Sequence, residues 1–250
     1  MLQPDARRSP RHDRWYVVVP VKGGPWAKSR LGGAPAPRGR LALAMALDCL
    51  EAVLATPSVA GALVVTDDDA AAAAATAAGA HVVTPSPVTS GSPLDAAVRD
   101  GARAATAPQQ RSRPGGPAPG SSPHQDEESA GVAVLLADVP ALRPQELEAA
   151  LAAAADQLAA GAGAVVVPDA AGRGTALLAA ARAQDLPVAY GEGSAERHAA
   201  AGAVRLELDL PGLRRDVDTP ADLRAVLALG VGPRTRAVLE LADPARAVAG

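Results

Sequence analysis

Residues 17–31 read VVVPVKGGPWAKSRL, and they join an expected strand to a candidate ligand loop. The β-branched run at 17–19 predicts a short buried strand that ends at Pro20. Glycines and cations follow at once, namely Lys22, Gly23, Gly24, Lys28 and Arg30. Glycine lets a backbone approach a ligand closely, and clustered cations suit a polyphosphate. The stretch therefore predicts a loop suited to a polyphosphate at the end of a first strand. The alternative is a solvated loop with ordinary surface charges.

Strand and helix patterns alternate along the rest of the chain, which predicts a largely parallel sheet covered by helices on both faces. Further strands are expected at 62–66, 81–84, 132–137, 164–167 and 204–208. Helices are expected over 43–54, up to residue 78, over 95–105, from 144 to about 158, over 176–182 and over 220–229. Thr219, Pro220 and Asp222 form a well-specified start for the last of these helices.

The composition limits the kind of core and the number of domains. Of the 250 residues 48% are apolar, yet there is no Phe and there are only two Trp and two Tyr, so the core must consist of Val, Leu and Ala. We expect a disordered polar tail at 1–14 and one domain over 15–250 with a flexible insertion at 106–130. The single cysteine, Cys49, excludes an internal disulfide and a cysteine-rich zinc site, and its helical apolar setting indicates a buried residue.

The charge and hydropathy of the chain exclude two classes of partner. A net charge of −3 argues against a general nucleic-acid-binding protein, which needs a basic face. No apolar run approaches the length that crosses a membrane, and the basic N-terminus lacks a signal-type core. We therefore expect a soluble cytoplasmic protein without a nucleic-acid or membrane partner.

Acidic side chains follow the expected strands, at the edge where open α/β sheets bind ligands. Asp67 and Asp138 each come directly after a strand, and Asp216 and Asp218 are two residues apart. On an extended segment this spacing puts both carboxylates on one side and Val217 on the other. With Asp138 they predict an all-oxygen Mg²⁺ site. The alternative, helix capping, is already served by Thr219.

Several other residues have two interpretations each. The segment 172–175, Gly-Arg-Gly-Thr, suits a phosphate or carboxylate, and Ser194 either does the same or caps a helix. The acids at 67–69 contact a ribose or base, or complement a helix dipole, and the dipole interpretation is favoured. His198 indicates a structural role. Arg214 and Arg215 form either an anion clamp or a solvated charge cluster.

With these motifs together, the chain resembles the phosphoenolpyruvate or 2-phospho-L-lactate guanylyltransferases of coenzyme F-420 biosynthesis. The resemblance spans about 15–235, apart from 106–130. It is carried by VPVKGGPWAKSRL, RLALAMALD at 40–48, VVTDD at 64–68, ADVPAL at 137–142, the GT-containing loop, GEGS at 191–194 and RRDVDTPADL at 214–223. It implies a three-layer αβα nucleotidyltransferase fold like that of the nucleotide-diphospho-sugar transferases, with a mostly parallel, mixed, Rossmann-like sheet.

The resemblance also implies roles for individual residues. Asp138, Asp216 and Asp218 match the Mg²⁺-binding aspartates of the family. Thr175, Gly191 and Ser194 match its phosphoenolpyruvate contacts. Lys22 and Lys28 fall in its nucleotide-phosphate loop and, with Asp138, are the expected catalytic residues. The expected nucleotide-binding residues are Gly23, Gly24, Arg30 and Asp67.

The implied reaction transfers GMP from GTP to phosphoenolpyruvate, giving enolpyruvoyl-diphospho-guanosine and pyrophosphate, with a hand-off to the downstream F-420 transferase. Alternatives are 2-phospho-L-lactate or 3-phospho-D-glycerate as acceptor, a molybdenum-cofactor type of nucleotidyltransferase, or a nucleotide-sensing module. The chain departs from the family pattern twice: Arg173 stands where a Thr is common, and Asp95 stands where an Asn is common. The first departure bears on the acceptor and the second on base or ribose contact.

Overall fold

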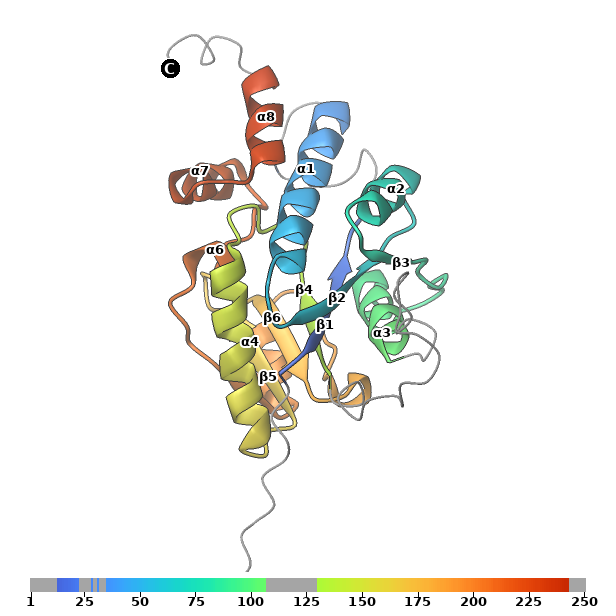
Figure 1. Ribbon diagram of the computed structural model, residues 1–250, viewed down its shortest axis with the longest axis vertical. Coiled ribbons are helices and arrows are strands. Elements are labelled where there is room, and N and C mark those ends of the chain that lie inside the picture. The colour runs from blue at the N-terminus through green and yellow to red at the C-terminus, as the bar shows by residue number, and fades with distance from the viewer. Residues whose placement is uncertain (1–12, 23–27, 29–30, 32–34, 107–129, 243–250) are drawn as a thin grey trace, which may run out of the picture.

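The computed structural model describes residues 13–22, 28, 31, 35–106 and 130–242 (Figure 1). The expected tail at 1–14 and insertion at 106–130 lie outside these residues except at their ends. Gly23, Gly24 and Arg30 of the expected phosphate loop also lie outside them.

A single seven-stranded sheet runs through the described part of the molecule, in the order β3-β2-β1-β4-β6-β5-β7. Every neighbouring pair is parallel except the two that involve β6, which is antiparallel to both β4 and β5. The expectation of a mostly parallel, mixed sheet is therefore confirmed. The strands are β1 (Trp15–Pro20), β2 (Val59–Val65), β3 (His81–Val83), β4 (Gly131–Leu135), β5 (Ala164–Pro168), β6 (Thr175–Ala180) and β7 (Ala203–Arg205).

The prediction of a helix over 176–182 is wrong, because this segment contains most of β6. All six residues of β6, TALLAA, are buried between β4 and β5. Leu and Ala favour a helix in isolation, but two neighbouring strands supply hydrogen-bond partners on both sides, and both faces of the segment are covered. Tertiary context therefore overrides the local propensity.

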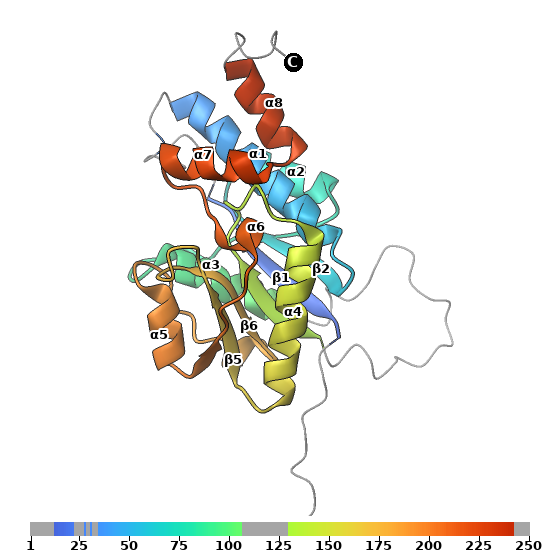
Figure 2. The ribbon, with the colours of Figure 1, turned by 90° about the vertical axis from the view of Figure 1, so that its left-hand side faces the viewer.

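Helices cover both faces of the sheet, as expected for a three-layer αβα fold. One face packs against α1 (Pro35–Leu54), α2 (Asp69–Ala77), α4 (Pro144–Ala159) and α6 (Pro211–Arg214). The other face packs against α3 (Pro93–Ala105) and α5 (Ser194–Ala200). Figure 2 shows α4 and α5 on opposite sides of β5 and β6. A short 3₁₀ helix, η4 (Ala183–Asp185), follows β6.

The two apolar layers contain mainly Val, Leu and Ala, and small residues allow close contact between helix and sheet. Gly101 of α3 lies against β1 and β2, where a Cβ atom would come within 2.4 Å of the Val18 side chain. Cys49 is buried under the sheet, as expected, with its thiol 3.8 Å from the carbonyl oxygen of Leu136.

The C-terminal helices form a smaller cluster with α1 at one end of the molecule (Figures 1 and 2). These helices are α7 (Pro220–Leu229) and α8 (Pro233–Ala242). Thr219 and Asp222 form a capping box at the start of α7, and the helix spans 220–229, as predicted. This box fixes the direction in which the segment with Asp216 and Asp218 enters the helix.

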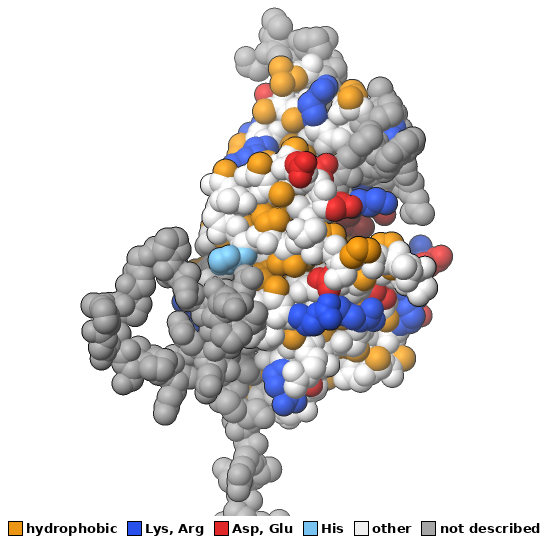
Figure 3. Space-filling view, turned by 90° about the vertical axis from the view of Figure 1, so that its right-hand side faces the viewer, with side chains coloured by type: hydrophobic (Ala, Val, Ile, Leu, Met, Phe, Trp, Pro, Cys, Tyr) orange, Lys and Arg blue, Asp and Glu red, His pale blue; other side chains and the backbone are white. Residues whose placement is uncertain are grey.

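None of the described helices combines the length and the apolar content needed to cross a membrane. The face drawn in Figure 3 carries basic side chains beside acidic ones. This mixture agrees with the small net charge of −3.

Candidate active site

Three carboxylates from distant parts of the chain meet beyond the end of β4. Asp138 follows β4, and Asp216 and Asp218 lie on the extended segment before α7. Each offers one oxygen within 4.8 Å of the others. The backbone N–H of Val217 donates to the carbonyl of Asp138 at 3.0 Å, and the Val217 side chain is fully buried on the opposite side. The predicted side-by-side arrangement of Asp216 and Asp218 is therefore present in the structure.

Lys28 joins this cluster from the loop after β1. Its ammonium donates to Asp138, and it lies 2.8 Å from Oδ1 of Asp218. Burial alone would lower the pKa of Lys28, but the two carboxylates outweigh it and raise that pKa. Lys28 has a φ of +53°, in the left-handed region. A charged lysine therefore neutralises part of the acidic cluster.

The hydrogen bonding and the electrostatics of the acidic cluster both favour a bound divalent cation. Oδ1 of Asp138 is buried and has no hydrogen-bond partner among the described residues. Burial together with repulsion from Asp138 and Asp218 raises the pKa of Asp216 to about 6. Carboxylate oxygens are the donors that hard divalent cations prefer. The arrangement is consistent with a divalent metal site, since a cation would satisfy the orphaned oxygen and relieve the repulsion.

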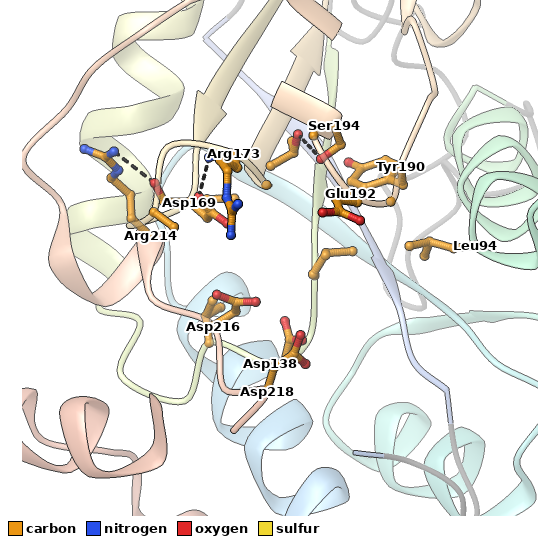
Figure 4. A pocket seen from close by; sticks show the side chains of 18 of the residues that line it. Leu94, Asp138, Asp169, Arg173, Tyr190, Glu192, Ser194, Arg214, Asp216 and Asp218 are labelled. Atoms are coloured by element: carbon orange, nitrogen blue, oxygen red, sulfur yellow. Dashed lines mark hydrogen bonds between the residues drawn. The ribbon is translucent and has the colours of Figure 1, made fainter. Parts of the chain in front are cut away.

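Two pockets meet at the acidic cluster and share Leu94, Leu136, Asp138 and Asp218. The smaller, of about 550 Å³, is lined by Thr175, Gly191 and Ser194, the three residues expected to contact an acceptor. Figure 4 shows the three aspartates facing Arg173 and Ser194 across this pocket. The larger, of about 930 Å³, is lined by Lys22, Lys28 and Asp67. The expected acceptor residues and the described nucleotide residues thus line two different pockets that meet at Asp138 and Asp218.

The turn between β5 and β6 forms one wall of the smaller pocket. Asp169 holds it by accepting from the backbone N–H of Arg173 at 2.9 Å, and a Cβ at Gly174 would meet the Asp169 carboxylate at 2.4 Å. Arg214 donates to the carbonyls of Pro168, Asp169 and Leu208 at 2.7–3.0 Å. The Arg214 guanidinium braces this turn and is not part of a solvated charge cluster. It also lines the smaller pocket, so the anion-clamp interpretation stays a prediction.

Arg173 lies in the same turn, and its exposed guanidinium points into the smaller pocket toward Asp216 (Figure 4). It is a cation in a pocket whose other charged side chains include Asp169 and Glu192. Arg173 is therefore placed to meet a ligand anion.

The loop 189–194 forms the opposite wall and is held by three side chains. Asp95 accepts the backbone N–H of Tyr190 at 2.9 Å, and Arg197 donates to the carbonyl of Ala189. His198 accepts the backbone N–H of Ala189 at 3.1 Å. Asp95 therefore anchors the loop that carries Gly191 and Ser194.

The structure brings together most of the residues singled out in the sequence. Ser194 is not a helix cap, because Gly193 occupies that position and Ser194 begins α5. Asp68 caps α2 through the backbone N–H of Ala71, which confirms the dipole interpretation for that residue, while Asp67 lines the larger pocket. Sequence reasoning missed Tyr190, which lines the smaller pocket. Its buried hydroxyl has no hydrogen-bond partner among the described residues. Its position directly before the GEGS turn was the signal that could have identified it.

No family model matches the chain. Over 232 residues it is 49% identical to a phosphoenolpyruvate guanylyltransferase of Geodermatophilus obscurus, covering 90% of this chain and 94% of that one. Identity to a phosphoenolpyruvate guanylyltransferase of Streptomyces coelicolor is 46% over 228 residues, covering 90% and 95%.

Two solved structures share the fold at low sequence identity. A Desulfovibrio desulfuricans G20 protein assigned as a nucleotide-diphospho-sugar transferase has a TM-score of 0.59 at 15% identity, covering 92% of this chain and 95% of that one. A Methanothermobacter nucleotidyl transferase has a TM-score of 0.52 at 19% identity, covering 87% and 98%. The fold is therefore that of the nucleotidyltransferases.

Proposed function

Because the chain belongs to the phosphoenolpyruvate guanylyltransferase family, we propose that it transfers GMP from GTP to phosphoenolpyruvate. The observation that carries this proposal is the pair of pockets that share Asp138 and Asp218. A two-substrate transfer needs both reactants to reach one point from different sides. The larger pocket then takes GTP and the smaller one takes phosphoenolpyruvate.

The reaction needs no side-chain nucleophile, because the acceptor phosphate is already ionised. A phosphate oxygen of phosphoenolpyruvate forms a bond to the α-phosphorus of GTP, the bond from that phosphorus to the β-phosphate oxygen breaks, and pyrophosphate leaves. Catalysis is then positioning and charge neutralisation, as in other phosphoryl-group transfers.

The chain's own residues divide this work. Asp138, Asp216 and Asp218 would hold Mg²⁺, which when bound supplies positive charge at the phosphates. Lys28, which pairs with two of these carboxylates, and Lys22 on the wall of the larger pocket neutralise the triphosphate. Asp67 contacts the nucleoside from the same pocket.

The smaller pocket is assigned to the acceptor because it offers hydroxyl donors and a cation. Thr175 and Ser194 present hydroxyls, Gly191 presents backbone, and Arg173 supplies a guanidinium. Charge-assisted hydrogen bonds of this kind suit a carboxylate or a phosphate. Gly23, Gly24 and Arg30 remain proposed nucleotide contacts on the resemblance alone, and the product is proposed to pass to the downstream F-420 transferase.

The test is pyrophosphate release by the purified protein with GTP, Mg²⁺ and one acceptor at a time. Inorganic pyrophosphatase in the assay converts the released pyrophosphate into phosphate, which is the quantity measured, and keeps the reaction from being held back by its product. We expect turnover with phosphoenolpyruvate and much less with 2-phospho-L-lactate or 3-phospho-D-glycerate. A preference for either of those would overturn the acceptor but keep the reaction, whereas release from none of the three would overturn the function.

Two aspartate variants separate the site from general charge effects. Asp218→Asn should lower kcat by at least about 10–100-fold, the range seen for changes in metal surroundings. Asp209→Asn changes the same residue type at an exposed position outside both pockets and should leave turnover unchanged. Near-normal turnover of Asp218→Asn at saturating Mg²⁺ would remove Asp218 from the mechanism.

A further inference from the structure

The buried side chain of His198 lies within hydrogen-bond distance of Thr175, one of the residues expected to contact the acceptor. Nδ1 of His198 lies 2.9 Å from Oγ1 of Thr175, which in turn lies 2.9 Å from Oγ of Ser194. On its other side, Nε2 accepts the backbone N–H of Ala189 at 3.1 Å. The side chains of Thr175, Ser194 and His198 are all buried. Thr175 and Ser194 line the smaller pocket, whereas His198 does not.

These contacts fix the tautomer of the ring. A backbone N–H can only donate, so Nε2 must be the unprotonated, accepting nitrogen. Burial and the positive charge of Arg197 lower the pKa of His198 to about 4, against the opposing effect of Asp95, so the ring is neutral at neutral pH. A neutral imidazole carries one proton, which therefore lies on Nδ1 and is donated to Thr175.

The tautomer decides how many hydroxyl protons remain for a ligand. Thr175 and Ser194 have two hydroxyl protons between them. With Nδ1 donating to Thr175, one of these protons makes the Thr175–Ser194 hydrogen bond and the other is free to point into the pocket. With the opposite tautomer, Thr175 would donate to the ring and Ser194 to Thr175, so the pair would offer the pocket only lone pairs.

We propose that His198 is a positioning residue that, by donating to Thr175, keeps one hydroxyl proton of the Thr175–Ser194 pair free, so that this pair donates to an anionic oxygen of the acceptor. An anion is bound by donors and repelled by lone pairs, so the backbone amide of Ala189 controls acceptor binding through the ring. The inference rests on the proposed function only for the identity of the acceptor, phosphoenolpyruvate.

The first test does not depend on activity. In ¹⁵N NMR of the histidine-labelled full-length protein without substrates, we expect Nδ1 of His198 to be the protonated nitrogen throughout pH 6–8. His198→Gln identifies the signal by its loss. A ring protonated on Nε2, or on both nitrogens, would overturn the proposal whether or not the protein transfers GMP.

The second test uses two variants that each keep one half of the ring. Asn places an amide nitrogen near the position of Nδ1 and can still donate to Thr175, whereas Gln reaches toward the Nε2 position and cannot. We expect His198→Gln to raise the KM for phosphoenolpyruvate by about ten-fold, as for the loss of a hydrogen bond to a charged group, with the KM for GTP unchanged. His198→Asn should stay within about three-fold of wild type, on the same scale. Equal KM values for the two variants would contradict the proposal.

A double variant distinguishes positioning from general support of the fold. If His198 acts through Thr175, the KM for phosphoenolpyruvate of His198→Gln with Thr175→Val should equal that of Thr175→Val alone. Additive effects would show that His198 acts by another route. If wild type turns over none of the phospho-acids, the proposed function fails on its own, while the NMR result still decides the tautomer.

Discussion

Replacing Asp216 with asparagine should make the metal-free protein more stable at pH 7, although this residue belongs to the acidic cluster. Burial and repulsion from Asp138 and Asp218 raise its pKa from 3.8 to about 6. The folded state therefore binds the proton more tightly than the unfolded state. The free energy of unfolding must fall as pH rises from about 4 to about 6, and the whole loss is present at pH 7.

The size of the effect follows from the shift. A displacement of about two pKa units corresponds to about 3 kcal/mol. Part of the Asp216 carboxylate reaches solvent, which screens the charge, so we expect about 1–2 kcal/mol in practice. Asparagine has nearly the same shape but no charge, so Asp216→Asn should recover this amount.

Urea unfolding followed by circular dichroism in EDTA measures the difference directly. Asp216→Asn should be more stable than wild type at pH 7, and the difference should shrink as pH falls toward 4. Asp209→Asn is the matched control and should show no such change. Added Mg²⁺ should stabilise wild type and have little effect on Asp216→Asn. If Asp216→Asn is no more stable than wild type in EDTA at pH 7, the electrostatic reasoning is wrong.

Three further outcomes test other parts of the structure. Gly101→Ala improves helix propensity, but its Cβ would lie 2.4 Å from Val18, so urea unfolding should show a net loss of about 1–3 kcal/mol; equal or greater stability would mean that α3 does not pack as described. Arg173→Gln should raise the KM for phosphoenolpyruvate about ten-fold, because an ionic hydrogen bond is lost, and leave the KM for GTP unchanged; the reverse pattern would move Arg173 to the nucleotide. Burial raises the pKa of the Cys49 thiol, so a thiol reagent at pH 8 should label it only after unfolding; rapid labelling of the native protein would contradict the burial.

Local patterns predicted the elements whose signals are local. The capping box at Thr219 and the shared side of Asp216 and Asp218 depend on residues within a few positions of one another, and both are present. The alternation of strands and helices likewise gave the layered fold. Asp138 joined the predicted cluster because it follows a strand, at the sheet edge where ligands bind, and the family resemblance implied the same residue.

Local sequence patterns could not predict the features that depend on contacts between residues far apart in the chain. The strand β6 was predicted as a helix because Leu and Ala favour helices, and only pairing with β4 and β5 shows otherwise. His198 lies 23 residues from Thr175, and the backbone amide that fixes its tautomer comes from a separate loop. A sequence does not reveal which buried polar groups will face one another, so the histidine was recognised as structural but not connected to Thr175.

The antiparallel direction of β6 places one wall of the proposed acceptor pocket on a different part of the chain from the proposed metal-binding aspartates. Because β5 leads straight into β6, the wall of the smaller pocket is a turn of a few residues between two buried strands, while the aspartates come from β4 and from the segment before α7. Residues at the tip of this turn can be exchanged without shifting the pairing of either strand. With the acceptor in the smaller pocket, as proposed, a lineage that inherits this hairpin can adapt to another phospho-acid through a handful of surface substitutions and leave the aspartates untouched.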